Sequence, residues 1–314
     1  MYAKYFVLFA ILFTGWFLRK INFIDDKMNH SMNKLIVYFA YPCLIVHNIG
    51  NVDMTGRVVL DFLIAFGISL ICFFLYGLMA FAYAGARKFP AEVSNVAEFA
   101  MSTPNNGFMG FPVSLLFFGE KGLFLMLAHN AAMNFFIFTY GTNLLQRNSP
   151  ERKKPTLRTV SRAIFKFLLN PNILALFIGF VLSLLGGSLP EAVDEYLLYI
   201  GNVSTPMAMI FIGSSLATSD MHKVFTTRIV IEASIVKLLV MPAVTLGLVF
   251  FLPVDPLIKS IVVLGIAFPT AATVSMLAEQ ENQSALTASM ILVFSTIASI
   301  ATVPGAVGII NAVF

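Results

Sequence analysis

Charged residues are scarce in this sequence. Only 11% of the 314 residues are Asp, Glu, Lys or Arg, whereas soluble domains carry about 25%. Hydrophobic residues make up 58%, and the mean hydropathy is +0.86. So few charges would not cover the surface of a soluble globule of this size. The composition therefore excludes a soluble enzyme, a disordered or fibrous chain and a nucleic-acid-binding protein, and it indicates a surface covered by the lipid bilayer.

Cysteine and histidine are also scarce. The two cysteines, Cys43 and Cys72, lie in apolar runs, which excludes a disulfide framework or a CxxC metal site. The four histidines show no metal-ligand spacing such as HExxH. No nucleophile elbow and no pair of carboxylates at catalytic spacing occurs. We therefore expect neither catalysis nor a metal or other cofactor, apart from a coupling ion.

Long apolar runs dominate what is present. A helix needs about 20 predominantly apolar residues to cross a bilayer, and short loops connect the candidates. We predict an all-α polytopic membrane protein with ten spans, at about 2–19, 31–50, 57–84, 91–118, 122–145, 164–187, 194–217, 228–252, 256–279 and 284–313.

The positive charges predict the orientation of these spans, because cytoplasmic loops are enriched in Lys and Arg. With the N-terminus outside, the basic residues inside are Arg19, Lys20, Lys27, Lys34, Arg87, Lys88, Arg147, Arg152, Lys153, Lys154, Arg158, Arg162, Lys166, Lys223 and Arg228. Only Lys4, Arg57, Lys121 and Lys259 fall outside. We predict a plasma (inner) membrane protein with both termini outside and a cytoplasmic basic linker at 146–163.

The two halves of the sequence repeat weakly. ILFTGWFL at 11–18 resembles ALFIGFVL at 175–182, and Pro42 and Pro206 keep the same offset of 164 residues. Pro104 and Pro269 are offset by 165 residues. Five spans are an odd number, so a second five-span repeat enters the membrane from the opposite side. We predict a repeat at 1–145 and an inverted repeat at 164–314, an arrangement typical of secondary transporters.

The most informative segment is STPNNGFMGFP at 102–112, in the fourth span. Its prolines and glycines interrupt a helix, and interrupted backbone at membrane depth is tolerated only inside protein or along a cavity. Its counterpart in the ninth span is AFPTAATVS at 267–275. If the two broken helices cross, their positive half-helix ends suit a carboxylate. The alternative is a pair of kinks that only shape packing. The substrate-site candidates here are Pro104, Asn105, Asn106, Gly107, Pro269, Thr270 and Thr273.

Other polar residues lie within spans, where ionisable groups are costly and point to function. Candidates for ion coupling or support are Glu98, Lys237, Glu232 and Asp61. Lys237 is expected to pair with Glu98 or Glu232, either titrating during transport or forming a static ion pair. Asn130 and Asn134 share a helix face and are candidates for the substrate site. His47 either lines the substrate path or makes a local polar contact.

PNNGFMGFP at 104–112 resembles the fourth-helix crossover motif of the auxin efflux carrier family. FAYPCLIVH at 39–47 resembles the second helix of that family, NPN at 170–172 the start of the sixth, MAMIFIG at 207–213 the seventh, and Pro269 the ninth-helix crossover. The similarity covers nearly the whole chain. The short central loop and Asn106-Gly107 differ from the plant carriers and are similar to bacterial members.

The resemblance implies a ten-helix, five-plus-five inverted fold like that of bile-acid symporters, with crossover helices four and nine. Helices one, two, six and seven would form a scaffold, often a homodimer, and the others a transport domain that moves as an elevator. Family substrates are small organic anions: auxin in plants, malate or malonate in bacteria. Asn105 would contact the substrate, and Asn130 would be the polar position of helix five.

We therefore expect a secondary transporter of small carboxylates. The alternatives are a sodium-coupled carrier of bulkier, bile-acid-like anions and a non-transporting receptor on the same fold. Sodium coupling, proton coupling and potential-driven transport all remain open, because the sequence does not require a particular ion site.

Overall fold

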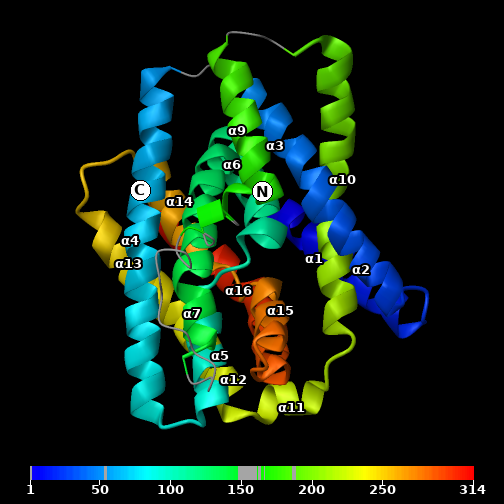
Figure 1. The fold of residues 1–314 in the computed structure, drawn as a ribbon, viewed down its shortest axis with the longest axis vertical. Coiled ribbons are helices and arrows are strands. Elements are labelled where there is room, and N and C mark those ends of the chain that lie inside the picture. Colours follow the sequence, from blue (N-terminus) through cyan, green and yellow to red (C-terminus); the bar gives the residue numbers. More distant parts are fainter. Residues whose placement is uncertain (1, 53–54, 148–160, 162–163, 166, 186–188) are drawn as a thin grey trace.

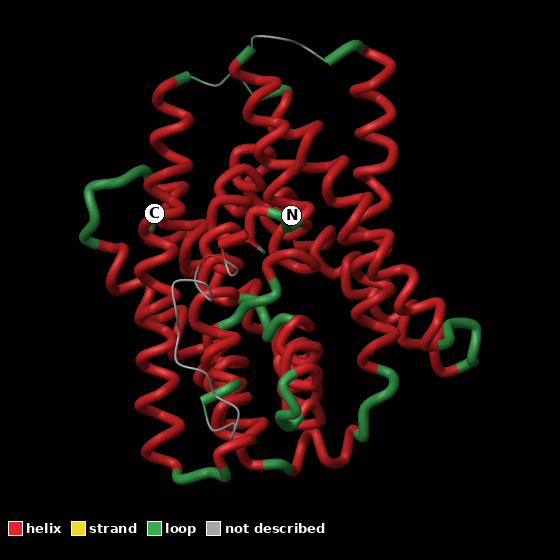
Figure 2. The backbone as a smooth tube through the Cα atoms, viewed as in Figure 1, coloured by secondary structure: helices red, strands yellow, loops and turns green. Residues whose placement is uncertain are grey.

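The computed structural model describes residues 2–52, 55–147, 161, 164–165, 167–185 and 189–314. The described elements are helices, joined by short loops (Figure 2). The predicted basic linker at 146–163 lies almost entirely outside the described residues. The all-helical fold class is confirmed for the part of the chain that the structure describes.

The first half of the chain begins with one straight helix and one interrupted helix. Its elements are α1 (Tyr2–Lys20), α2 (Asp26–Leu35), the π-helical turn η1 (Ile36–Ala40), α3 (Tyr41–Gly50), α4 (Gly56–Arg87), α5 (Ala91–Ser102), η2 (Asn106–Gly110), α6 (Phe111–Phe136), η3 (Ile137–Gly141) and α7 (Thr142–Leu145). Gly119 has a φ of 65° and a non-helical ψ, so it separates α6 into two helical parts.

The second half also contains long helices and interrupted helices. Its elements are α9 (Pro171–Leu184), α10 (Glu191–Leu216), α11 (Met221–Thr226), α12 (Arg228–Ile235), η4 (Val236–Val240), α13 (Met241–Phe250), α14 (Pro256–Ala267), α15 (Ala272–Gln280) and α16 (Ala285–Val313). In Figure 1, α1, α2, α3 and α10 lie to the right, and α4, α12 and α13 to the left.

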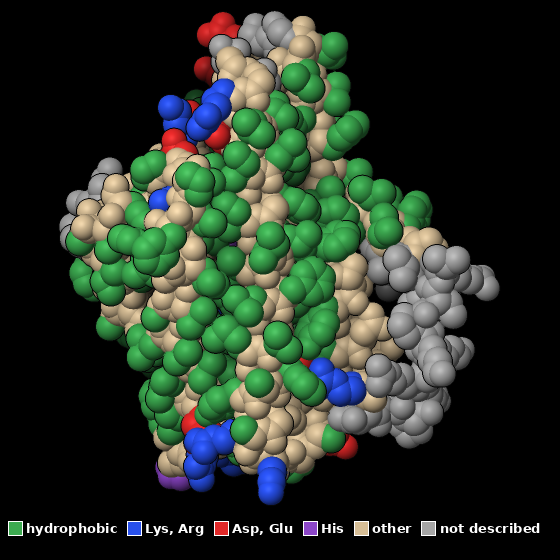
Figure 3. Space-filling view, turned by 90° about the vertical axis from the view of Figure 1, so that its left-hand side faces the viewer, with side chains coloured by type: hydrophobic (Ala, Val, Ile, Leu, Met, Phe, Trp, Pro, Cys, Tyr) green, Lys and Arg blue, Asp and Glu red, His purple; other side chains and the backbone are tan. Residues whose placement is uncertain are grey.

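Five stretches of helix in the described residues are long and apolar enough to cross a membrane. They are Gly56–Arg87, Asn106–Leu145, Glu191–Leu216, Arg228–Phe250 and Ala285–Val313, and α9 and α14 are shorter apolar helices. Figure 3 shows hydrophobic side chains over the middle of one face and charged side chains toward its two ends. This distribution is that of a protein with a lipid-facing surface, and the polytopic character is confirmed. The ten-span count remains a prediction.

Several long helices contain π turns next to proline. The N–H of Tyr41 donates to the carbonyl of Ile36, and the N–H of Met241 donates to that of Val236, five residues back instead of four. Pro42 and Pro242 follow directly. Because proline lacks an N–H and clashes with the preceding turn, a wider turn lets the helix continue past it. Such turns occur frequently at functional sites.

Close helix packing is made possible by glycine. Gly15 of α1 faces the backbone of Ile210 on α10, where a Cβ would lie 2.7 Å from the Ile210 Cα. Gly179 of α9 faces Ile49 of α3, where a Cβ would lie 2.6 Å from the Ile49 Cβ. Only glycine allows these approaches. The pairs α1–α10 and α3–α9 therefore pack with their backbones close together.

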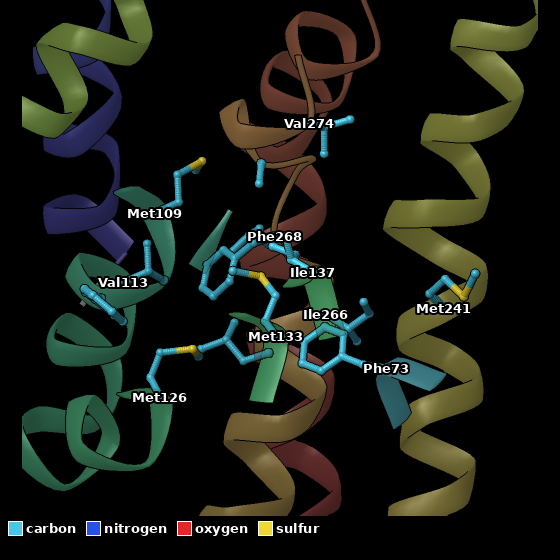
Figure 4. Packing of buried hydrophobic residues seen from close by; sticks show 14 of the residues in the cluster. Phe73, Met109, Val113, Met126, Met133, Ile137, Met241, Ile266, Phe268 and Val274 are labelled. Carbon is cyan, nitrogen blue, oxygen red and sulfur yellow. The ribbon is translucent and has the colours of Figure 1, made fainter. Parts of the chain in front are cut away.

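The remaining helices form a second group around a buried core. Helix α4 packs on α5 and α6, and α16 packs on α12, α14 and α15. Figure 4 shows Met109, Met126 and Met133 near Phe268 in this core. A Cβ on Gly110 would contact both the sulfur of Met126 and the ring of Phe268 at 3.3 Å. The core therefore surrounds the place where the broken helices meet.

Candidate functional site

Two helix interruptions lie against each other at the centre of the fold. Helix α5 ends at Ser102 and η2 begins at Asn106, while α14 ends at Ala267 and α15 begins at Ala272. Residues 103–105 and 268–271 pair as an isolated antiparallel bridge between Pro104 and Thr270. We call these two segments the paired breaks.

Backbone hydrogen bonds join the paired breaks. The N–H of Asn105 donates to the carbonyl of Pro269 at 2.7 Å, and the N–H of Ala271 donates to that of Thr103 at 3.0 Å. Thr103 and Phe268 are extended, as expected where a proline follows. Backbone groups that lose helical partners at a proline need new ones away from water. Each break supplies them to the other.

Side chains satisfy further backbone groups at this position. The Thr270 hydroxyl donates to the carbonyl of Ala100 at 3.0 Å, near the end of α5. The N–H of Thr270 donates to the hydroxyl of Ser295 on α16 at 3.1 Å. The Ser102 hydroxyl donates to the carbonyl of Glu98 at 2.9 Å. The carboxyl end of α5 is thus held by neutral hydroxyl groups.

Two helix N-termini begin at the paired breaks. The Asn105 side-chain oxygen caps η2 by accepting the N–H of Phe108 at 3.2 Å. Ala271 precedes α15 and provides no side-chain cap. The N-terminal N–H groups of a helix attract anions. The paired breaks therefore place two partially positive helix ends close together.

Some buried polar atoms here have no hydrogen-bond partner among the described residues. They are the Thr103 hydroxyl, the Asn105 amide nitrogen and the Asn106 amide oxygen. Asn105 is 2% exposed, and Thr103 and Asn106 are fully buried. The Asn106 amide nitrogen reaches only the sulfur of Met133, at 3.4 Å. Most buried polar groups in proteins are hydrogen-bonded, so this cluster is an exception that calls for an explanation.

Exposure differs between the two half-helices. Thr273, the second residue of α15, is exposed, whereas Gly107 and Phe108 of η2 are half-buried. The Tyr41 hydroxyl donates to the Gly107 carbonyl at 2.7 Å, and the ring of Phe108 lies 5.1 Å from that of Phe211 on α10. The start of this half-helix is therefore contacted by α3 and α10, whereas Thr273 on α15 is exposed.

Lys237 is fully buried in η4, and its Nζ donates to the carbonyl of Ile266 at 3.1 Å. This carbonyl is in the last turn of α14, where the side-chain donor supplies a partner to a backbone acceptor near the helix end. The expected ion pair of Lys237 with Glu98 or Glu232 is wrong. His129 packs nearby against Gly265, and its Nδ1 lies 2.8 Å from the Ser69 hydroxyl.

Both glutamates pair with arginine instead. Glu98 is fully buried and accepts two hydrogen bonds from Arg147 at 2.9 Å each, with a third from the Tyr140 hydroxyl at 2.5 Å. Glu232 pairs with Arg87 and Arg228. Arginine can bind a carboxylate with two parallel hydrogen bonds. The sequence pattern did not indicate that these glutamates pair with arginine.

The other sequence candidates lie apart from these contacts. His47 on α3 lies with its Nδ1 2.7 Å from the carboxylate of Asp194 on α10. Of the two alternatives for His47, this is the polar contact. Asp61 pairs with Arg57 near the start of α4. Asn130 and Asn134 lie on α6, on either side of Met133 in sequence. Neither makes a hydrogen bond to the paired breaks among the described residues.

Two residues that contact the site, Tyr41 at Gly107 and Ser295 at Thr270, were not predicted from the sequence. Tyr41 belongs to the FAYPCLIVH motif at 39–47, which assigned it no role. Ser295 was not a candidate for the site. The available signal for Tyr41 was its place directly before Pro42. Ser295 carries no local signal, because it reaches Thr270 only through the folding of α16 onto α14.

The fold and the site define a polytopic membrane protein with a polar centre made from two broken helices. A family model described as "Membrane transport protein" matches residues 1–307. The chain belongs to this family of transporters, and the resemblance to auxin efflux carriers is confirmed.

Individual relatives agree with the family. An "Uncharacterized transporter" of Methanothermobacter thermautotrophicus is 24% identical over 94% of this chain and 93% of that protein. An uncharacterized transporter of Methanocaldococcus jannaschii is 24% identical over 84% of each chain. A protein of Rhizobium meliloti named "Putative malonate transporter" is 24% identical over 95% of this chain and 92% of that protein.

Proposed function

We propose that this chain is a secondary active transporter of small carboxylates, with malonate as the first candidate and malate as a second. The observation that carries the site is the cluster of unpartnered polar atoms on Thr103, Asn105 and Asn106 at the start of a half-helix. A buried polar group without a partner costs about 1–3 kcal/mol. A carboxylate would accept from the Asn105 amide and from the helix ends. The name of the Rhizobium meliloti relative supports malonate.

The proposed site consists of Pro104, Asn105, Asn106, Gly107, Pro269, Thr270 and Thr273. Asn105 has two roles in it: its oxygen caps the half-helix, and its nitrogen remains available to a ligand. Thr270 fixes the second break against α5. Asn130 and Asn134 would contact the substrate from their positions on α6.

The proposed mechanism is alternating access by an elevator movement of an inverted repeat. The scaffold would consist of α1, α2, α3, α9 and α10, and it would also form the surface of a proposed homodimer. The other helices would form the domain that moves. Support comes from the glycine contacts: Gly15 and Gly179 are offset by 164 residues, as are Ile49 and Gly213. Gly179 faces Ile49, and Gly213 faces Leu12 and Trp16, on either side of Gly15. The α3–α9 contact thus has a counterpart in the α1–α10 contact.

We propose the orientation given by the basic residues, with both termini outside the plasma membrane. Two substitutions test it. Phe251 is 84% exposed after α13 and Lys223 lies on α11. Phe251→Cys should react with an impermeant thiol reagent from outside the cell and Lys223→Cys only from inside. The reverse pattern would overturn the orientation.

Malonate binding tests the site. Two substitutions separate the roles of Asn105, because Ser caps a helix about as well as Asn but has no amide. Asn105→Ser should retain the thermal stability and weaken malonate binding at least tenfold in calorimetry. Asn105→Asp keeps the capping oxygen and adds a negative charge, so it should abolish binding. Asn48→Ala, whose side chain bonds only its own helix at Leu44, is the control and should bind normally. Unchanged binding in Asn105→Asp would overturn the site.

A further inference from the structure

The hydrogen bond from Tyr41 to Gly107 links two groups of helices. Tyr41 begins α3 and is 1% exposed, and its hydroxyl donates to the Gly107 carbonyl at 2.7 Å. Its ring lies 5.3 Å from Phe111 in an edge-on arrangement and 6.0 Å from Phe108. A residue of the proposed scaffold is therefore bonded directly to a residue of the proposed site.

The Gly107 carbonyl is available because of a proline and a π turn. In an α-helix it would accept the N–H of Phe111, but that N–H donates to Asn106 instead. In the π turn its partner would be residue 112, which is proline and has no N–H. Tyr41 supplies the missing donor from a different helix. The bond therefore satisfies a backbone group that the half-helix cannot satisfy by itself.

This bond covers one side of the paired breaks only. Gly107 lies in the first turn of the half-helix that continues into α6, above the paired breaks in Figure 1, and α15 lies below them. On the α15 side Thr273 is exposed. Tyr41 thus contacts the half-helix from the side of α3, whereas Thr273 on α15 is exposed.

The repeat gives this bond a counterpart. Tyr41 precedes Pro42, and the residue that precedes Pro206 is Thr205 on α10. Gly107 shifted by 165 residues, the offset of Pro104 and Pro269, is Ala272 on α15. In the part of the chain that the structure describes, no hydrogen bond joins Thr205 and Ala272, and both are half-buried. One of the two repeat-related contacts is made and the other is not.

We propose that the Tyr41–Gly107 hydrogen bond is a latch that holds the present arrangement, in which η2 is bonded to α3, and that Thr205 and Ala272 approach each other when it opens. The proposal rests on the inverted-repeat transport mechanism proposed above. A ligand is not needed for the latch, because both of its partners belong to the chain. The strength of the Tyr41–Gly107 hydrogen bond should affect how often the site alternates between the two faces of the membrane.

Cysteine accessibility tests the latch in the full-length protein. The native cysteines, Cys43 and Cys72, are buried and would be replaced by alanine. Thr273→Cys, at an exposed position of α15, would report accessibility to an impermeant thiol reagent in proteoliposomes without substrate. Tyr41→Phe removes only the hydroxyl. One net hydrogen bond changes an equilibrium by about fivefold, so labelling of Thr273→Cys from the α15 side should slow by at most about this factor. Disulfide formation in Thr205→Cys/Ala272→Cys should rise in the same background.

Tyr76→Phe is the matched control, because the Tyr76 hydroxyl is also buried and pairs with Thr245 at 2.5 Å, between α4 and α13. This control should leave labelling unchanged. Equal labelling in Tyr41→Phe and the parent, with no gain in disulfide, would overturn the latch. Altered labelling together with no malonate flux in the parent protein, which keeps Thr273, would instead overturn the proposed substrate. The two failures are therefore distinguishable.

Discussion

Asn105 and Pro269, 164 residues apart in sequence, are joined by a backbone hydrogen bond of 2.7 Å. Each lies in a segment where proline has interrupted a membrane-embedded helix. The bond brings the beginning of one half-helix beside that of another, next to the unpartnered Asn105 amide nitrogen. Several consequences of this arrangement can be measured.

Thr270→Val should destabilise the protein. The Thr270 hydroxyl is fully buried and donates to Ala100 on another helix, so its loss leaves a buried carbonyl without that donor at a cost of about 1–3 kcal/mol. The melting temperature in detergent should fall. Thr139→Val is the control, because Thr139 bonds only its own helix at Phe135. Equal melting temperatures for the two variants would contradict the role of Thr270.

Gly15→Ala and Gly179→Ala should both lower stability, because a methyl group would collide with Ile210 and Ile49, respectively. Overpacking of this kind costs about 1–3 kcal/mol. Gly67→Ala on α4 meets no atom within 4 Å and should be neutral or stabilising, since alanine favours helix more than glycine. Thermal unfolding of the three variants measures this. Parent-like stability of Gly15→Ala would argue against close packing of α1 and α10.

Glu98→Gln should be strongly destabilising, because it leaves the Arg147 guanidinium beside a buried neutral group. Breaking a buried ion pair costs about 3–5 kcal/mol, and the partial exposure of Arg147, at 27%, places the expected loss toward the lower end. The double variant Glu98→Gln/Arg147→Met should recover part of the loss. Additive losses in this double-mutant cycle would show that the two side chains are not coupled.

Lys237→Met should destabilise the end of α14. It removes the donor to Ile266 while it keeps a side chain of similar length, so the expected loss is about 1–3 kcal/mol. Lys237→Arg retains a donor and a charge and is the comparison. Melting temperatures of both variants test this; a Met variant as stable as the parent would mean that the buried ammonium does not support the helix end.

The sequence was sufficient for the features that depend on local chemistry. Apolar runs predicted a polytopic helical protein, and the prolines and glycines of 102–112 and 267–275 marked the segments where α5 and α14 end. Partners between distant helices were not predictable in this way. Span composition suggested that Lys237 pairs with a glutamate, but which cation reaches Glu98 depends on how η3 and α7 pack on α5. Arg147 falls in the predicted linker at 146–163, and nothing in the sequence of that linker indicates that Arg147 reaches a buried glutamate.

Direct measurement of malonate flux tests the central claim. Labelled malonate uptake would be recorded in proteoliposomes with a sodium gradient, a proton gradient or an imposed potential, for the parent, Asn105→Ser and Asn48→Ala. We predict saturable flux that depends on one of these gradients, is lost in Asn105→Ser and is retained in Asn48→Ala. Parent-like flux in a folded Asn105→Ser variant, or binding of malonate without flux under any gradient, would contradict the account.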